Sequence, residues 1–324
     1  MIAFAVAYVL SQSYKTWERK VKKQIKFGLV LSCFLCLQGC AIKQVAISKL
    51  GDTLAEGGSV YASDNDMELV GAALPFSLKT VEGLLAEVPE HKGLLLTAAS
   101  GFTQYSYVYV DLDAMEIEAT DLRRAAEQKQ RAKNLYLRGW NYALRAVELT
   151  HKDFISGLRQ NPATTLAAFS KEDIPALYWL SLSWAAAIAS DKSDMDLVAD
   201  LNLIDPIMRR CLELDETYDH GALHEFMISY QGGRSPLQGG GASLAREHFA
   251  RTVELSGNIR VGSLVSLAES VSVGEQNRPE FEHLLEQALA FDVNIHVETR
   301  LANLVAQKRA RLLLARSDSL FLED

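Results

Sequence analysis

Apolar side chains recur at helical spacing through most of the chain. One predicted helix face carries Leu135, Gly139 and Ala146, and a second face near the C-terminus carries Leu301 and Val305, each at the three-and-four residue spacing of an amphipathic helix. Only 7 prolines occur among 324 residues, and alternating runs rich in Val, Ile and Thr are scarce. The pattern predicts an all-α fold.

Turn-forming residues divide this pattern into helices of about 12 to 25 residues. The predicted breaks are Pro89, Pro162, Asp191 and the segments 215–221, 232–241 and 256–258. The best strand candidate is "YSYVYVDLD", which begins at Tyr105 and could equally be the last turns of a helix. The helices joined by turns indicate paired-helix units.

Three helical segments carry apolar or small residues in one register, as in the tetratricopeptide pattern A-x3-F-x2-A. The register places Ala245, Phe249 and Thr252 in the first segment, Leu285 and Ala288 in the second, and Ile204, Met208 and Cys211 in the third. The turns after these segments lie about 40 and 37 residues apart, which is longer than the 34-residue unit. We therefore expect degenerate tetratricopeptide-type repeats forming a curved helical array in residues 66–324.

The N-terminal part resembles the leader of an exported lipoprotein. A lysine-rich cluster precedes "FGLVLSCFLCLQGC", residues 27–40, which is shorter than the roughly 20 residues of a membrane span. We expect residues 21–39 to be the signal peptide, Cys40 the lipid attachment site, and residues 40–65 the lipid-anchored segment. An uncleaved anchor is the alternative. Residues 1–20 are a possible mis-annotated extension, because a start at Val21 leaves a compact leader.

Cysteines and charges agree with this division of the chain. Cys211 is the one cysteine after Cys40, so that part of the chain cannot form an internal disulfide. The whole chain carries a charge of −8, and residues 1–39 contribute six positive charges and one negative charge, so the remainder carries −13. An acidic surface of this size argues against nucleic acid or anionic lipid as the partner.

Five segments in order resemble one family closely. They are "RAKNLYLRGWNYALRAVEL", "DIPALYWLSLSWAAAIA", "GALHEFMISY", "AREHFARTVEL" and "LANLVAQKRARLLLA", between residues 131 and 315. Together they are similar to the T-component family of tripartite ATP-independent periplasmic (TRAP) transporters. The resemblance implies a tetratricopeptide-type lipoprotein that associates with the soluble substrate-binding subunit of the transporter. It also implies a small organic molecule passing through a cavity between helices, and a homo-oligomer such as a trimer.

No set of residues in the sequence supports catalysis. His220 and His224 lie four residues apart, but Glu225 follows them, whereas a zincin needs its glutamate between the histidines. We favour capping and packing roles for these residues over a zinc site. The glycine-rich segment 232–241 lacks the lysine of a phosphate loop. We therefore expect a protein that is not an enzyme and needs no cofactor or metal.

Two groups of residues are candidates for binding a ligand or partner. The first group is aromatic, and Trp140, Trp179 and Trp184 either fill the core or line a cavity. The second lies on one face of the last long helix, where Arg300, Asn303 and Gln307 either form a solvated stripe or bind. The uncharged amides of the second group are an unusual choice for solubility alone.

These observations lead to two competing functions. The first is a lipid-anchored accessory subunit of TRAP-type solute uptake that binds the soluble receptor at the periplasmic face of a bacterial membrane. Ala41 after Cys40 favours the outer membrane in a Gram-negative cell. The alternative is a tetratricopeptide scaffold lipoprotein for outer-membrane or cell-wall assembly.

Overall fold

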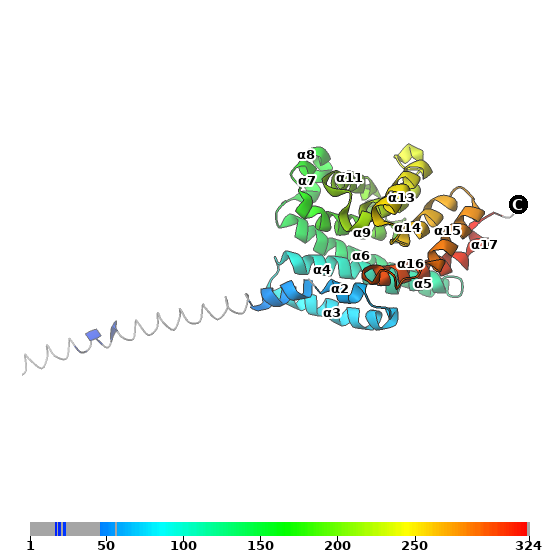
Figure 1. Ribbon diagram of the computed structural model, residues 1–324. Helices are drawn as coiled ribbons and strands as arrows, with labels where there is room; N and C mark the ends of the chain where they lie inside the picture. The colour runs from blue at the N-terminus through cyan, green and yellow to red at the C-terminus, as the bar shows by residue number, and fades with distance from the viewer. Residues whose placement is uncertain (1–16, 18, 21, 24–45, 56, 323–324) are drawn as a thin grey trace, which may run out of the picture. The chain divides into compact units, whose positions relative to one another are not determined.

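The computed structural model describes residue 17 and residues 19–20, 22–23, 46–55 and 57–322 (Figure 1). The chain divides into two compact units, Met1–Leu50 and Gly51–Asp324. Cys40 and most of the predicted leader lie outside the described residues, so the leader, the lipid attachment and their boundaries stay predictions.

The described part of the second unit is helical and contains no strand, which confirms the all-α prediction. The longer helices are α3 (Met67–Glu87), α4 (Lys92–Ser106), α6 (Leu122–Glu148), α9 (Ile174–Ser190), α11 (Ile204–Asp215), α12 (Ala222–Gly232), α13 (Ala242–Ser256), α15 (Arg278–Ala290) and α16 (Arg300–Leu314). A repeat arrangement of these helices stays a prediction.

Shorter helical segments connect them. The short α-helices are α2 (Gly58–Ala62), α5 (Leu112–Ile117), α7 (Phe154–Gln160), α8 (Pro162–Ala167), α10 (Met195–Ala199), α14 (Gly262–Leu267) and α17 (Ser317–Leu320). Two segments are π-helical, η1 (Tyr107–Asp111) and η6 (Ala268–Ser272). Single 3₁₀ turns occur at η2 (Lys171–Asp173), η3 (Asp200–Leu203), η4 (Tyr218–Gly221), η5 (Pro236–Gln238) and η7 (Val297–Thr299).

Helix starts follow from capping side chains in the sequence. The Asp66 carboxylate accepts a hydrogen bond from the Leu69 amide at the start of α3, and Asp121 accepts one from the amide of Arg124 at the start of α6, both at 2.9 Å. These bonds satisfy amide groups that the first helical turn leaves without a partner.

The main core forms where α6 packs against α4 and α9. Trp184 of α9 is 1% exposed in this core, and its ring tilts against Trp140 of α6 with centroids 5.5 Å apart. Gly139 permits the close approach of α6 to α4, because a Cβ there would lie 2.6 Å from Thr103 Oγ1 and 3.0 Å from the Ala99 carbonyl. A second core joins α13, α14, α15 and α16 around Phe281.

The strand-like stretch "YSYVYVDLD" is helical, so the second of its two interpretations is correct. It runs from the end of α4 through η1 into α5. Val110 packs with Tyr136 of α6 on one side, whereas Val108 and Leu112 pack with Val305 of α16 on the other. Burial from two sides gives an alternating apolar pattern, which in a sequence is typical of a strand.

The last long helix packs against the first helices of the unit. α16 contacts α2, α3 and α5, and Figure 1 shows it beside α2 and α5. Arg300 donates to the Ser63 carbonyl at 2.9 Å, and Lys308 pairs with Asp113 at 2.9 Å. These contacts join residues about 200 positions apart and place α16 in the wall of a central cavity.

Candidate functional site

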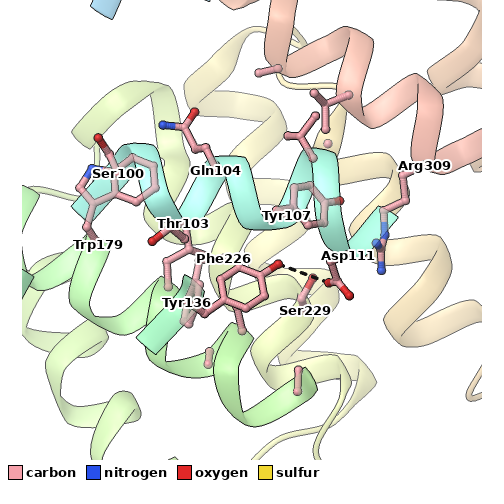
Figure 2. Close-up of a pocket in the computed structure, with 18 of the residues that line it drawn as sticks. Ser100, Thr103, Gln104, Tyr107, Asp111, Tyr136, Trp179, Phe226, Ser229 and Arg309 are labelled. Atoms are coloured by element: carbon pink, nitrogen blue, oxygen red, sulfur yellow. Dashed lines mark hydrogen bonds between the residues drawn. The ribbon is translucent and has the colours of Figure 1, made fainter. Parts of the chain in front are cut away.

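A cavity of about 1650 Å³ lies between the helices of the second unit. Its wall includes side chains of α3, α4, η1, α9, α12, η6 and α16. Figure 2 shows part of this wall, with Ser100, Gln104 and Trp179 at one side and Tyr107, Asp111 and Arg309 at the other. Most small-molecule sites occupy about 300–1,000 Å³, so the space is large enough for an organic ligand.

A cluster of polar side chains lies on the cavity wall. It consists of Tyr107 and Asp111 from η1, Tyr136 from α6, Glu269 from η6 and Arg309 from α16. The Tyr136 hydroxyl donates to Asp111 Oδ2 at 3.3 Å. Arg309 donates through Nε and Nη2 to the two oxygens of Glu269 at 2.8 and 2.6 Å. Its guanidinium also lies over the Tyr107 ring, 5.5 Å from the centroid.

Both π-helical segments contribute to this cluster. In η1 the amide of Leu112 bonds to the carbonyl of Tyr107, and in η6 the amide of Val273 bonds to the carbonyl of Ala268. Tyr107 and Asp111 lie four residues apart and so share one side of the helix. Short π segments within α-helices occur frequently at functional sites, and here each one supplies a carboxylate to the cavity.

Burial sets the protonation of the cluster. It raises the pKa of the Asp111 carboxyl, and the positive charge of Arg309 offsets part of that rise. Burial also raises the pKa of the Tyr107 and Tyr136 hydroxyls, which therefore stay neutral and can donate hydrogen bonds. Arg309 is compensated by Glu269, whereas Asp111 has a neutral hydroxyl as its hydrogen-bond partner.

Aromatic and apolar side chains line the rest of the cavity. Trp179 comes from α9, Phe226 from α12 and Leu182 from α9. A second charged pair, Arg260 with Glu225, also lies on the wall. The cavity thus offers an apolar surface together with a few fixed polar groups, which is the usual composition of a site for an organic molecule.

Sequence comparison assigns the family. The family model of the TRAP transporter T-component matches residues 63–321. The chain belongs to the TRAP transporter T-component family. A protein of Treponema pallidum (strain Nichols), described as uncharacterized, is 28% identical over 310 residues, which cover 90% of this chain and 96% of that protein. The family is one of accessory transporter components, and membership suggests a periplasmic or membrane-associated location.

In this T-component the three candidate tryptophans divide between core and cavity. Trp179 is half-buried and lines the cavity. Trp184 is buried, and Trp140 packs against it at the edge of the main core. Both alternatives that the sequence left open therefore occur, each for different residues. A ligand-binding role for Trp179 stays a prediction.

The residues on the face of α16 have different surroundings from those expected of a solvated stripe. Asn303 is 2% exposed, accepts from the Val261 amide at 3.2 Å and donates to the Ile259 carbonyl at 2.9 Å. Gln307 is 6% exposed and donates to the carbonyls of Ala288 and Phe291. The solvated-stripe interpretation is wrong for both amides.

These amides hold neighbouring backbone in place. Asn303 fixes the turn between α13 and α14, and Gln307 satisfies carbonyls at the end of α15. Arg300 of the same helix binds the carbonyl of Ser63. The polar atoms of Asn303 and Gln307 already bond within the T-component. A role for either residue toward a ligand or partner stays a prediction.

The histidines of the rejected zinc motif lie apart. His220 is exposed at a backbone φ of 53°, whereas His224 is buried and its Nδ1 lies 2.8 Å from Nδ1 of His248. No group of three or more potential metal ligands occurs among the described residues. The sequence did not indicate the pairing, since His248 lies on the next helix, 24 residues away.

An exposed apolar strip runs along α3. Leu69 and Phe76, seven residues apart, are 59% and 79% exposed on the side away from the buried Val70 and Leu78. By length and composition α3 is the one described helix that could span a membrane, and 22% of its apolar window is buried. In this structure the buried face of α3 packs against α4.

Proposed function

We propose that this T-component is the lipid-anchored accessory subunit of a TRAP-type solute uptake system. It is tethered through Cys40 at the periplasmic face of the membrane, and Ala41 favours the outer membrane. It contacts the soluble substrate-binding subunit and holds a small organic molecule in the central cavity. The cavity of about 1650 Å³, in a chain of this family, is the observation that carries the proposal.

The exposed strip on α3 supports a protein contact. Among the described residues no helix covers Leu69 and Phe76, which present apolar area to solvent. Such surface commonly marks an interaction site. A contact between a tethered subunit and a free receptor should be transient, with micromolar affinity and a modest interface. A homo-oligomer such as a trimer is the alternative, in which the same strip is buried between copies of the chain. The mass of the protein in solution distinguishes the two cases.

The test titrates the purified cognate receptor, with and without its solute, onto the anchored full-length protein. We expect saturable binding in the micromolar range. Phe76→Ser should weaken it several-fold. Leu122→Ser is the matched control, because Leu122 is 74% exposed at the start of another helix, α6. Its binding should equal that of the wild type.

Absence of binding at tens of micromolar would contradict the uptake proposal. The scaffold alternative would then take its place, and partners captured by crosslinking in cells would be envelope assembly proteins. If the Phe76→Ser variant bound the receptor as tightly as the wild type, the receptor contact would stand but would not lie on α3.

A further inference from the structure

We propose that the cavity binds organic cations, with an ammonium head group at Asp111 and an apolar body along the aromatic wall. This inference rests on the ligand-binding part of the proposed function and names the class of ligand. It is carried by the ion pairing of the side chains near Asp111 and by the aromatic side chains around it.

The basic side chains near the cluster are already paired with carboxylates of the same wall. Arg309 bonds twice to Glu269, Arg260 pairs with Glu225, and Lys129 and Arg316 both pair with Glu118. These carboxylates also line the cavity. These four bases therefore have little left to offer an anionic ligand, and Arg234 and Lys192 are the other basic side chains on the wall.

Asp111 differs from these carboxylates. Among the described residues its side chain makes one hydrogen bond, from the neutral Tyr136 hydroxyl at 3.3 Å, and no basic side chain lies within ion-pair distance of it. Arg309 acts on Asp111 from beyond ion-pair distance and is itself bonded to Glu269. A carboxylate on a cavity wall that has no ion-pair partner of its own favours either a proton or a cationic ligand. An ammonium group would supply that partner and hydrogen-bond donors together.

The aromatic groups around Asp111 suit the same head group. The ring of Tyr107 already faces one cation, the guanidinium of Arg309, and Tyr136 lies at hydrogen-bond distance from Asp111. Aromatic faces attract cations, and quaternary and primary ammonium ligands are commonly held in such surroundings. Figure 2 shows Tyr107, Tyr136 and Asp111 together, with Trp179 farther along the same wall.

An organic acid would be a poor ligand in this position. Its carboxylate would be repelled by Asp111, and Arg309 would have to exchange its two bonds to Glu269 for bonds to the ligand. A neutral alcohol would keep the contacts of the apolar body but would gain no charge interaction. We therefore expect affinity to be highest for the ammonium ligand, lower for the alcohol and lowest for the carboxylate.

The experiment measures calorimetric titrations of full-length protein in nanodiscs of zwitterionic lipid, with protein-free nanodiscs as the blank. The probes are octylammonium, octan-1-ol and octanoate, which share one apolar body. We expect the cation to bind at least tenfold more tightly than the alcohol, and octanoate to bind most weakly. Asp111→Asn should lower the cation affinity about tenfold and leave the alcohol unchanged. Asp113→Asn, a matched change on the outer side of α5, should leave both unchanged.

Two results would overturn the inference while the receptor contact stands. Equal affinity for the three probes, or a preference for octanoate, would exclude the cation site and keep a cavity for another ligand class. Failure of all three probes to bind would exclude ligand binding as well. Circular dichroism checks the fold of Asp111→Asn, and if that variant does not fold, the head-group order in the wild type still decides.

Discussion

His224 and His248 share a single hydrogen bond, with their Nδ1 atoms 2.8 Å apart. One ring must donate and the other must accept, so the bond is lost when both rings carry a proton on Nδ1. Burial lowers the pKa of His224. Burial, together with the neighbouring His224, lowers the pKa of His248 to about 4. The pair is therefore neutral at pH 7 and connects α12 to α13.

This pair predicts that acid destabilises the fold. An unfolded histidine binds its proton near pH 6.5, whereas folded His248 resists protonation down to about pH 4. The unfolded state therefore binds more protons in this range, and stability falls as the pH falls from about 6.5 towards 4. Urea unfolding at pH 7, 5.5 and 4.5 measures the effect. His248→Gln should flatten the pH dependence, whereas His283→Gln, at an exposed position, should not.

The buried amide of Asn303 predicts a loss of stability when it is removed. Asn303→Ala leaves the buried Val261 amide and the Ile259 carbonyl without their partner. We expect a loss of about 1–3 kcal/mol in the free energy of unfolding. Asn294→Ala, in an exposed turn, should change stability by less than about 0.5 kcal/mol. Urea unfolding compares the two, and equal effects would contradict the structural role.

Replacing Asn303 and Gln307 together tests their predicted partner role. Receptor retention by the double alanine variant should be measured at a temperature where circular dichroism shows it fully folded. Weaker retention under those conditions would support a direct role in binding. Retention equal to the wild type would leave both amides with their backbone contacts alone.

We expect replacement of the two tryptophans of α9 to lower the free energy of unfolding by different amounts. Trp184 is enclosed by the main core, so Trp184→Ala should lower the free energy of unfolding by about 3–5 kcal/mol. Trp179 borders the cavity, and its replacement should cost less because part of its surface has no packing partner. Thermal unfolding compares the variants. Ligand-dependent fluorescence should disappear with Trp179→Phe, and a response that survives would place the ligand elsewhere.

If Cys40 carries the lipid anchor, replacing it should change where the protein is found in the cell. Cys40→Ser should abolish lipid attachment and leave unprocessed or released protein, because the thioether requires the cysteine sulfur. Cell fractionation and metabolic labelling with a fatty acid measure this. Cys211→Ser is the control, since Cys211 is buried in the main core. Mature, membrane-bound protein from Cys40→Ser would rule out the anchor.

The sequence predicted the helices well because helical periodicity is local. It could not predict the polar cluster, since Asp111, Tyr136, Glu269 and Arg309 come from four segments spread over about 200 residues. Spacing placed Asn303 and Gln307 on one face of α16, but it could not tell that α15 and the turn before α14 cover that face. The alternating pattern at Tyr107–Asp111 was the one local signal of an unusual helix.

The contact of α16 with α2, α3 and α5 limits how this protein can change in length. An open stack of repeats can gain or lose a terminal unit, because each unit touches only its neighbours. Here an added helix pair would separate Arg300 from Ser63, and a truncation before α16 would remove Arg309 from the cavity wall. Evolutionary insertions should therefore gather in surface turns such as residues 292–296, while the number of helices around the cavity stays constant.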